Sequence, residues 1–300
     1  MRAGALGDLL LLRPAIATLR TAGHRVRVLA PERPGSVLVG PDATCGALPW
    51  DGPEVAALLA GQAGGGPVGR ALAEADAVVA FTRSEPVLVA LDARARRLIA
   101  HDPTPPATGP HASRWLANAL GPLIGSGSSE PRDPGVLVFT EAERQEAAER
   151  VRALPAGFLA VHPGSGSPAK NWPWPRFLEA ARGLAAGRSW LLVAGPAERA
   201  LVPPPDAVLA REWQLRPLAA ALGRAGLFLG NDAGVSHLAA AAGTPTLALF
   251  GPTDPALWAP VGPRVATLVS PGRSLVDLGI GAVLAAARAL RSAASGLPSG

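Results

Sequence analysis

The chain has 300 residues, of which 48% are hydrophobic and 17% charged, so it can bury a sizeable core and is not a disordered protein. Its one cysteine, Cys45, excludes an internal disulfide and a cysteine-based metal site, and fits a reducing cytoplasm. The net charge of +5 rests almost entirely on scattered arginines, and no nucleic-acid motif accompanies them, so we expect no nucleic-acid partner.

The amino-terminal apolar run is short. It covers Leu9 to Leu12 and is interrupted by Arg13 and Pro14, whereas a signal peptide needs a longer apolar stretch and a cleavage site. No segment reaches the roughly 18 uninterrupted apolar residues of a membrane-spanning helix. We therefore expect neither secretion nor a transmembrane segment.

The first half of the chain alternates helical and extended patterns. A turn at Gly7 and Asp8 precedes a predicted helix over 9–22, and a second helix is predicted over 113–123. Strands are predicted over 25–30, 76–82 and, more weakly, 97–100. The Gly-, Ser- and Pro-rich stretch 125–135 is typical of a linker. It predicts a boundary between a domain of residues 1–135 and a domain of residues 136–300.

The second half is more regular. It opens with a helix whose start is predicted at Thr140, because Glu143 three residues later completes a capping box. The remaining expected strands cover 158–162, 190–194, 227–230 and 246–250. The remaining expected helices cover 175–186, 215–224, 235–242 and 274–292.

This alternation of strands and helices predicts an α/β protein with parallel sheets. Two such halves joined by a linker predict two Rossmann-like, doubly wound domains that face each other across a cleft, with the last helix as the segment that would pack back on the first domain. Ligands of open α/β sheets bind at the carboxyl ends of strands, so chemistry is expected in the loops that follow strands.

The first such loop runs from Gly4 to Asp8. Its glycines permit a tight turn, and Asp8 stands in the first turn of the following helix. On this motif alone, a helix-capping role for Asp8 is the better interpretation. The spacing differs from the GxGxxG fingerprint, so a nicotinamide enzyme is not indicated.

The second loop, His162 to Lys170, follows a strand and is rich in Gly and Ser. Such a loop ending in a cation is typical of a phosphate cradle. Lys170 is the only lysine of the chain, and its compact charge differs from the planar fork of arginine. From the residues alone, a phosphate contact and a surface lysine are equally supported.

The third loop, Gly230 to His237, opens a helix. The helix start suits an anion, while Asn231 and Asp232 suit sugar or ribose hydroxyls. His237 by itself is better explained as a structural histidine. Glu198 also follows a strand and could bind a ribose hydroxyl, whereas the GPTD segment at 251–254 reads equally well as a plain turn.

Several other enzyme classes lack their motifs here. The sequence has no Asp-x-Asp of metal-dependent nucleotide-sugar enzymes, no GxSxG hydrolase elbow and no HExxH or Cys/His cluster for zinc.

Three segments together resemble glycosyltransferase family 9, the heptosyltransferases of lipopolysaccharide core assembly. They are GALGDLLLLRPAIATLR, HPGSGSPAKNWPWPRFLEAA and LFLGNDAGVSHLAAAAGTPTLALFGPTDPALWAP, and the similarity is strongest from about 158 to 260. The resemblance implies the GT-B fold. Family members usually carry a β-strand just before the GALGD-like turn, and here that strand is nearly absent, so we expect the true start to lie upstream of Met1.

The resemblance also implies roles for individual residues. Asp8 matches the catalytic base. The other matching positions are expected to bind the donor: Ser165, Gly166, Lys170, Glu198, Trp213, Asp232, Ala233, Gly234 and His237. Ala233 departs from the family, in which a hydroxyl residue is common at this position, so one contact is lost.

The implied function is an inverting, metal-independent transfer of a sugar, with ADP-heptose as the expected donor and no cofactor. The expected acceptor is a lipopolysaccharide-type or other cell-surface glycan or glycolipid at the inner face of the membrane. We expect a bacterial protein that is monomeric, lies in the cytoplasm and is peripheral to the inner membrane. Two alternatives stay open: a GT-B nucleotide-sugar epimerase, and a non-catalytic nucleotide-sugar-binding or assembly protein.

Overall fold

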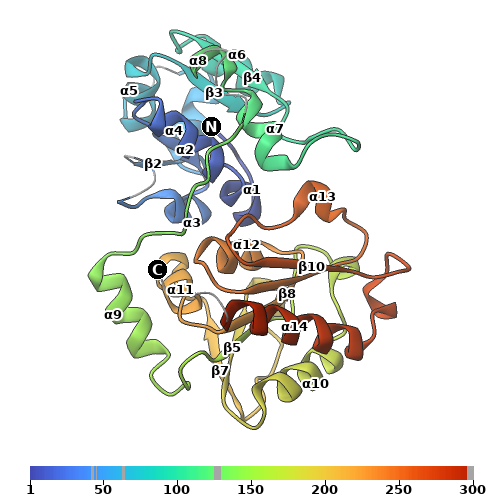
Figure 1. Cartoon of the computed structure of the whole chain (residues 1–300). Helices are drawn as coiled ribbons and strands as arrows, with labels where there is room; N and C mark the ends of the chain where they lie inside the picture. The colour runs from blue at the N-terminus through green and yellow to red at the C-terminus, as the bar shows by residue number, and fades with distance from the viewer. Residues whose placement is uncertain (42–43, 45, 63–64, 125–129, 296–300) are drawn as a thin grey trace. The chain divides into compact units, whose positions relative to one another are not determined.

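The computed structural model describes residues 1–41, 44, 46–62, 65–124 and 130–295. The chain forms two compact units, Met1–Pro134 and Gly135–Gly300, and the boundary predicted from the sequence falls one residue later. Residues 125–129 of the predicted linker lie outside the described residues. Figure 1 shows the elements of each unit.

The first unit contains two short parallel strand pairs. Strand β1 (Val28–Ala30) pairs with β2 (Ala47–Pro49), and β3 (Val78–Phe81) pairs with β4 (Leu98–His101). The helices of this unit are α1 (Leu6–Leu10), α2 (Arg13–Thr21), α3 (Glu32–Gly35), α4 (Pro53–Leu59), α5 (Pro67–Glu74), α6 (Glu85–Asp92), α7 (Ala112–Asn118) and α8 (Gly121–Ile124), with a 3-10 turn at Ser36–Leu38.

The helix predicted over 9–22 is wrong in one respect, because the structure divides it into α1 and α2. Pro14 lies in the first turn of α2, where its missing N–H and fixed φ favour a helix start and not a helix interior. Helix α1 begins at Leu6, which places Asp8 inside its first turn. The helix predicted over 113–123 is likewise divided, into α7 and α8.

Met1 and Arg2 lie between the two strand pairs. The Arg2 N–H donates to the Leu29 carbonyl of β1 at 3.1 Å, and the Phe81 N–H of β3 donates to the Met1 carbonyl at 3.0 Å. Arg2 also forms a parallel bridge with Phe81. These two residues therefore hold the position of a central strand, with β1 on one side and β3 on the other.

The second unit is built on a six-stranded sheet with every pair parallel, in the order β10-β9-β8-β5-β6-β7. Its strands are β5 (Leu159–His162), β6 (Trp190–Ala194), β7 (Ala207–Arg211), β8 (Leu227–Asn231), β9 (Thr246–Phe250) and β10 (Val265–Val269). Its helices are α9 (Glu141–Arg150), α10 (Trp174–Ala185), α11 (Leu215–Leu222), α12 (Gly234–Ala241), α13 (Pro255–Trp258) and α14 (Ile280–Ser295), with 3-10 turns at Pro168–Lys170, Pro196–Glu198 and Leu275–Asp277.

Helices cover both faces of this sheet (Figure 1). Alternate strand residues such as Leu159 and Leu192 form one buried cluster with Phe177 of α10 and with Val283 and Ala287 of α14. Helix α12 packs against β8 and β9 and contacts α11, which in turn contacts α9. The continuous burial of β5, β6, β8 and β9 explains why these strands are uninterrupted apolar runs in the sequence.

The cap of α9 is the capping box predicted from the sequence. The Thr140 hydroxyl accepts from the Glu143 N–H, and the Glu143 carboxylate accepts from the Thr140 N–H at 2.8 Å. Glu143 also pairs with Arg216 of α11. Burial raises the pKa of Glu143, but the hydrogen bonds from Arg216 and Thr140 outweigh it and hold the pKa below its usual 4.5. The ion pair therefore stabilises the folded state above about pH 4.5, and this contribution is lost as the pH falls through the folded pKa.

The variant Glu143→Gln is expected to lower the free energy of unfolding at pH 7 by about 1–3 kcal/mol, because it breaks a half-buried charged hydrogen bond. The difference from the parent chain should shrink in acid, where the parent carboxyl is also neutral. Urea unfolding at pH 7 and at lower pH measures both effects. Glu149→Gln on the same helix breaks only an exposed pair with Arg152 and should change stability by less than about 0.5 kcal/mol. Equal losses in the two variants would contradict this account.

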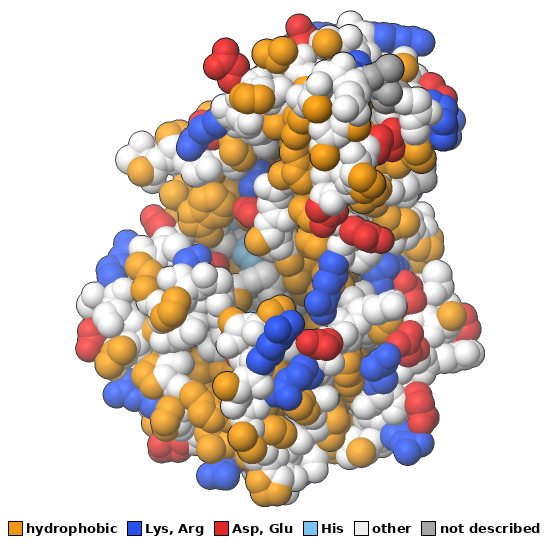
Figure 2. Space-filling view, turned by 180° about the vertical axis from the view of Figure 1, so that it is seen from behind, with side chains coloured by type: hydrophobic (Ala, Val, Ile, Leu, Met, Phe, Trp, Pro, Cys, Tyr) orange, Lys and Arg blue, Asp and Glu red, His pale blue; other side chains and the backbone are white. Residues whose placement is uncertain are grey.

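Charged side chains of both signs are interspersed over the face of the molecule shown in Figure 2. Exposed ion pairs of the chain include Arg83 with Asp102 and Arg144 with Glu141. Within the described ranges, no helix is both long enough and apolar enough to cross a membrane.

Candidate functional site

The sheet of the second unit reverses its strand order between β5 and β8. From β5 the chain builds outward through β6 and β7, and then returns to the other side of β5 with β8. The carboxyl ends of two adjacent parallel strands therefore open into loops that diverge, which is where open α/β sheets bind ligands. These are the loop after His162 and the loop after Asn231.

Asn231 ties these two loops together. Its side-chain oxygen accepts from the Trp172 N–H at 3.0 Å, and its side-chain nitrogen donates to the Pro163 carbonyl at 2.7 Å. The side chain is fully buried. Because both ends of the amide are used for structure, Asn231 fixes the shape of the loops and is not available as a ligand for hydroxyl groups.

Lys170 and Asp232 meet at this edge. The ammonium of Lys170 donates to Oδ2 of Asp232 at 2.8 Å, and the Thr253 hydroxyl donates to the same oxygen at 2.7 Å. The side chain of Asp232 is 8% exposed and that of Lys170 is 31% exposed. An ammonium has three N–H donors, so Lys170 retains two that an oxyanion could accept. The arrangement holds a positive charge at the mouth of the two loops.

Glu198 joins the site from the loop after β6. Its carboxylate accepts from the Gly195 N–H at 2.8 Å and lies directly against Gly164, where an added Cβ would come within 1.8 Å of Glu198 Oε1. Beneath it, Nδ1 of His162 donates to the Val193 carbonyl at 2.9 Å. Burial lowers the pKa of His162 despite the Val193 carbonyl and the nearby Glu198, so the ring is neutral at pH 7.

The variant Gly164→Ala is expected to displace the Glu198 carboxylate, since a methyl group would occupy its position. The end of Glu198 is flexible, so the fold should survive, while the affinity for a nucleotide at this edge should fall about tenfold, which corresponds to one charged hydrogen bond. Calorimetric titration with a nucleoside diphosphate measures the loss. Gly281→Ala, on α14 of the same unit, meets no atom within 4 Å and serves as the matched control. Equal affinity in both variants would contradict the proposed position of Glu198.

Helix α12 begins at Gly234, directly after the Asp232 loop. Its N-cap, Ala233, has no side-chain oxygen with which to bind the first-turn amides. Ser236 donates back to the Asn231 carbonyl at 2.5 Å, and His237 is buried in the first turn. The first-turn N–H groups and the helix dipole therefore favour an anion at this end.

Two expected donor-site residues have neighbours that the sequence did not predict. Trp213, in the loop after β7, is half-buried under the Arg150 guanidinium, which lies 4.9 Å from the ring centroid. The Ser165 hydroxyl donates to the Ser167 carbonyl at 2.7 Å. Gly166 is exposed beside it.

Asp8 lies in the first unit, and its carboxylate has two partners. Oδ2 accepts from the Ala5 N–H at 3.0 Å, so Asp8 caps α1 from within the first turn, whereas the N-cap itself, the position expected for Asp8, is Ala5. Oδ1 pairs with the Arg2 guanidinium at 2.9 Å. Arg2 is buried and also donates to the Pro103 carbonyl. A Cβ on Gly4 would come within 2.7 Å of the Asp8 Cβ, so Gly4 gives the Asp8 side chain its space.

Arg2 and Thr253 are the contacts that sequence reasoning missed. Arg2 stands six residues before Asp8, and Thr253 belongs to the GPTD segment that reads as a plain turn. Only their positions in the sequence could have indicated these two residues. Thr253 follows the carboxyl end of β9, and Arg2 belongs to the strand-like segment that begins at Met1. Within the part of the chain that the structure describes, no group of three or more His, Cys, Asp or Glu could hold a metal ion.

The model of the family described as "Glycosyltransferase family 9 (heptosyltransferase)" matches residues 106–280, more than half of the chain. The chain belongs to glycosyltransferase family 9. The match includes Lys170, Glu198 and Asp232 but ends short of Asp8 on the amino-terminal side. It confirms the resemblance seen in the sequence.

A curated relative, lipopolysaccharide heptosyltransferase 3 of Escherichia coli, is 31% identical over 114 residues, which are 34% of this chain and 34% of the relative. The match thus spans about a third of that protein.

Solved structures of family 9 proteins share the fold over nearly the whole chain. A family 9 glycosyl transferase from Veillonella parvula has a TM-score of 0.79 at 21% identity and covers 97% of this chain and 96% of its own. Escherichia coli ADP-heptose lps heptosyltransferase II has a TM-score of 0.75 at 19% identity, with 98% of each chain covered. Escherichia coli heptosyltransferase WaaC, solved with ADP, has a TM-score of 0.70 at 19% identity and covers 94% of this chain and 95% of its own. The GT-B fold class predicted from the sequence is confirmed.

Proposed function

We propose that this family 9 protein is an inverting, metal-independent glycosyltransferase that moves a heptose from ADP-heptose to a lipopolysaccharide-type or other cell-surface glycan acceptor. The observation that carries the proposal is the Lys170–Asp232–Thr253 group at the strand-order reversal of the second unit. It holds a cation beside an uncapped helix start, which suits the diphosphate of a nucleotide sugar. Escherichia coli heptosyltransferase WaaC has been solved with ADP and with ADP-2-deoxy-2-fluoro heptose, which supports the choice of donor.

In this proposal the donor diphosphate lies between Lys170 and the first turn of α12. Negative charge grows on the phosphate oxygens as the bond to the sugar breaks, and fixed positive groups stabilise that charge more than they stabilise the ground state. Glu198 and Trp213 would bind the nucleoside. The Gly166 and Ser165 segment would contribute loop N–H groups.

The acceptor hydroxyl would attack the anomeric carbon from the side opposite the diphosphate, with its proton passing to Asp8. One C–O bond forms, the bond from the anomeric carbon to the phosphate oxygen breaks, and ADP leaves. No cofactor takes part. The protein would work in the cytoplasm, peripheral to the inner membrane, as a monomer, with a glycan or glycolipid acceptor.

The first test is a thermal-shift panel of ADP, GDP, CDP, UDP and their sugars. A ligand at 100 times its dissociation constant stabilises the folded state by about 2.7 kcal/mol. ADP and ADP-heptose are expected to give the largest shifts. A panel in which another base leads, or in which no nucleotide shifts the melting temperature, would contradict the proposed donor.

Product analysis then tests the reaction class. The proposal expects transfer to a heptose-accepting glycolipid with inverted configuration, undiminished by a chelator. Formation of an epimer without acceptor would instead indicate a nucleotide-sugar epimerase, and tight binding without any product would indicate a non-catalytic protein.

A further inference from the structure

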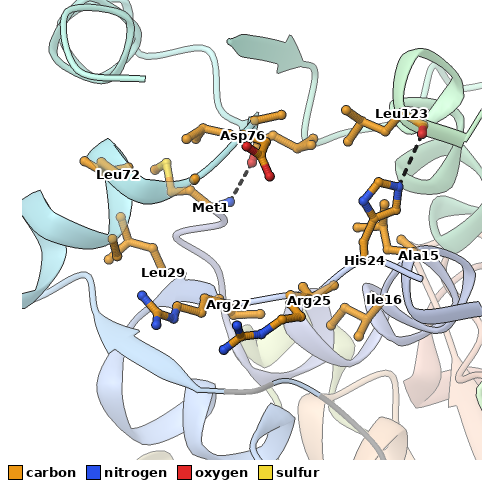
Figure 3. Close-up of a pocket in the computed structure, with 18 of the residues that line it drawn as sticks. Met1, Ala15, Ile16, His24, Arg25, Arg27, Leu29, Leu72, Asp76 and Leu123 are labelled. Atoms are coloured by element: carbon orange, nitrogen blue, oxygen red, sulfur yellow. Dashed lines mark hydrogen bonds between the residues drawn. The ribbon is translucent and has the colours of Figure 1, made fainter. Parts of the chain in front are cut away.

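The cavity of the first unit lies at the wrong end of its strands for a ligand of an open α/β sheet. It has a volume of about 610 Å³ and is lined by the residues that lead into β1 and β3, among them Arg27 and Asp76 (Figure 3). The Met1 amino group donates to the Val79 carbonyl in its wall. Ligands of such sheets bind at the carboxyl ends of strands, so a further ligand contact is expected there.

At the carboxyl end of β10, Arg273 holds a backbone conformation that arginine rarely adopts. Its φ is 57°, in the left-handed region, where residues other than glycine are uncommon and Asn, Asp and His are enriched. Two other described residues that are not glycine share a positive φ: Ala186, which caps α10, and Glu212. Strain of this kind persists only where the surrounding structure imposes it, and it is concentrated at ligand sites.

The surroundings of Arg273 impose this conformation from two sides. Its N–H donates to the Ser270 carbonyl at 3.0 Å, and the hydroxyl of the buried Ser270 donates to the Ser274 carbonyl at 2.6 Å, which closes a tight turn after β10. On the other side, a Cβ on Gly251 would lie 3.2 Å from the Arg273 carbonyl oxygen, so the loop after β9 packs directly against this residue. The position from which the Arg273 side chain extends is therefore fixed.

The Arg273 side chain is directed at the Lys170–Asp232–Thr253 group. Its Nη1 donates to the Thr253 carbonyl at 3.2 Å, while the Thr253 hydroxyl donates to the Asp232 oxygen that also accepts from Lys170. Arg273 is exposed, and a guanidinium has five N–H donors, so four remain for a ligand. Within the ranges that the structure describes, Arg273 forms no ion pair with a carboxylate. Thr253 thus connects two cations, of which Lys170 is already paired.

Arg273 supplies positive charge that the Lys170–Asp232 pair lacks. The ion pair of Lys170 with Asp232 has no net charge, and the start of α12 adds only a partial charge. The diphosphate of a nucleotide sugar carries a negative charge on each phosphate. The Arg273 guanidinium offers a full positive charge, and its planar fork can bond two phosphate oxygens at once.

The order of the strands places Arg273 toward the sugar end of the donor. In the proposed function, Glu198 and Trp213 bind the nucleoside from the loops after β6 and β7, and Lys170 meets the diphosphate after β5. The sheet continues from β5 through β8 and β9 to β10, with neighbouring strands about 4.8 Å apart. Arg273 follows β10 and reaches back to the loop after β9, so the phosphate within its reach is the one farther from the nucleoside.

We propose that Arg273 is a second donor-binding cation, which binds the phosphate that carries the sugar. As the bond from the anomeric carbon to this phosphate breaks, its electron pair stays with the phosphate oxygen, and the fixed guanidinium stabilises the growing negative charge. The proposal rests on the nucleotide-sugar donor of the proposed function and adds to it a contact from the loop after β10.

The variant Arg273→Asn tests this contact, because Asn tolerates the left-handed conformation and lacks the guanidinium. The affinity for ADP is expected to fall about tenfold, the loss of one charged hydrogen bond, whereas the affinity for AMP, which lacks the second phosphate, should be unchanged. Calorimetric titration measures both affinities. An unchanged ADP affinity, or an equal loss for ADP and AMP, would overturn the proposal.

Arg224→Asn is the matched control, since Arg224 is exposed and precedes β8, at the amino ends of the strands. It should bind ADP as the parent chain does. A similar loss in both variants would show only an effect of net charge and would overturn the proposal. Arg273→Lys keeps the charge without the fork and should recover part of the ADP affinity.

Inorganic pyrophosphate separates a failure of this proposal from a failure of the proposed function, because it has two phosphates and no nucleoside. A parent chain and an Arg273→Asn variant that bind ADP equally well would refute the role of Arg273 alone. A parent chain that binds pyrophosphate but no nucleotide would refute the proposed donor. The phosphate-binding role of Arg273 would then be supported by weaker pyrophosphate binding in Arg273→Asn and overturned by equal binding.

Discussion

The variant Asp8→Asn is expected to lower the turnover number by about 10²–10⁴-fold, the usual contribution of a general base. The amide retains an oxygen that can accept from the Ala5 N–H, so the helix cap survives. The amide loses the ability to take a proton, and it also loses the charge that pairs with the buried Arg2 guanidinium. Initial rates of glycosyl transfer at saturating donor and acceptor measure the effect.

Donor binding should be unchanged in this variant, because Lys170, Asp232 and Glu198 all belong to the second unit. Equal ADP affinities for the parent and the variant would thus separate a loss of chemistry from a loss of binding. A turnover number within threefold of the parent would refute the role of Asp8.

Asp76→Asn is the matched control. Asp76 is exposed, pairs with Arg96 and precedes β3, at the edge of the strands opposite to the one that carries Asp8. It loses the same charge from the same unit without touching the proposed site, and it should keep the parent rate. A fall in both variants would point to the net charge of the first unit and not to Asp8.

The Arg2 contact holds one oxygen of the Asp8 carboxylate in a fixed position. The guanidinium is buried, is anchored by the Pro103 carbonyl and presents a fixed donor to one carboxylate oxygen. The loop pattern alone favoured a helix cap, and the structure shows that capping uses only the other oxygen. The two interpretations of Asp8 in the sequence are therefore compatible.

The second unit was the easier half to predict. Strands β5, β6, β8 and β9 are central, so they are continuous apolar runs between Gly or Pro turns. The two strands that were missed, β7 and β10, are the edges of the sheet. Their residues are mostly half-exposed, and so their composition carries a weaker signal.

The side-chain contacts of the site could not be read from local patterns. Thr253 donates to Asp232 from a loop 21 residues further along the chain. The Asn231 side chain donates to the backbone carbonyl of Pro163 in another loop. Only the three-dimensional order of the strands places these groups together. The sequence could nominate Lys170 and Asp232 separately but could not predict that they bond to each other.

The variant Lys170→Met removes the ammonium that bonds to Asp232, and it is expected to lower the rate of glycosyl transfer strongly. Methionine keeps a long flexible stem but removes the ammonium. Loss of one preorganised group at a developing oxyanion costs about 10²–10³-fold in rate, and we expect a fall of this size in kcat/KM for the nucleotide sugar. Lys170→Arg should recover only part of it, since a planar fork differs from a compact ammonium.

A structural explanation of this loss must be tested separately, because Lys170→Met removes the ammonium from the buried Asp232 carboxylate and leaves the Thr253 hydroxyl bonded to it. The double variant Lys170→Met with Asp232→Asn removes that unpaired charge and should recover the melting temperature without recovering kcat/KM. Arg182→Met, an exposed cation on α10, controls for the loss of one positive charge. Recovery of activity in the double variant would show that Lys170 only neutralises Asp232 and does not bind the donor phosphate.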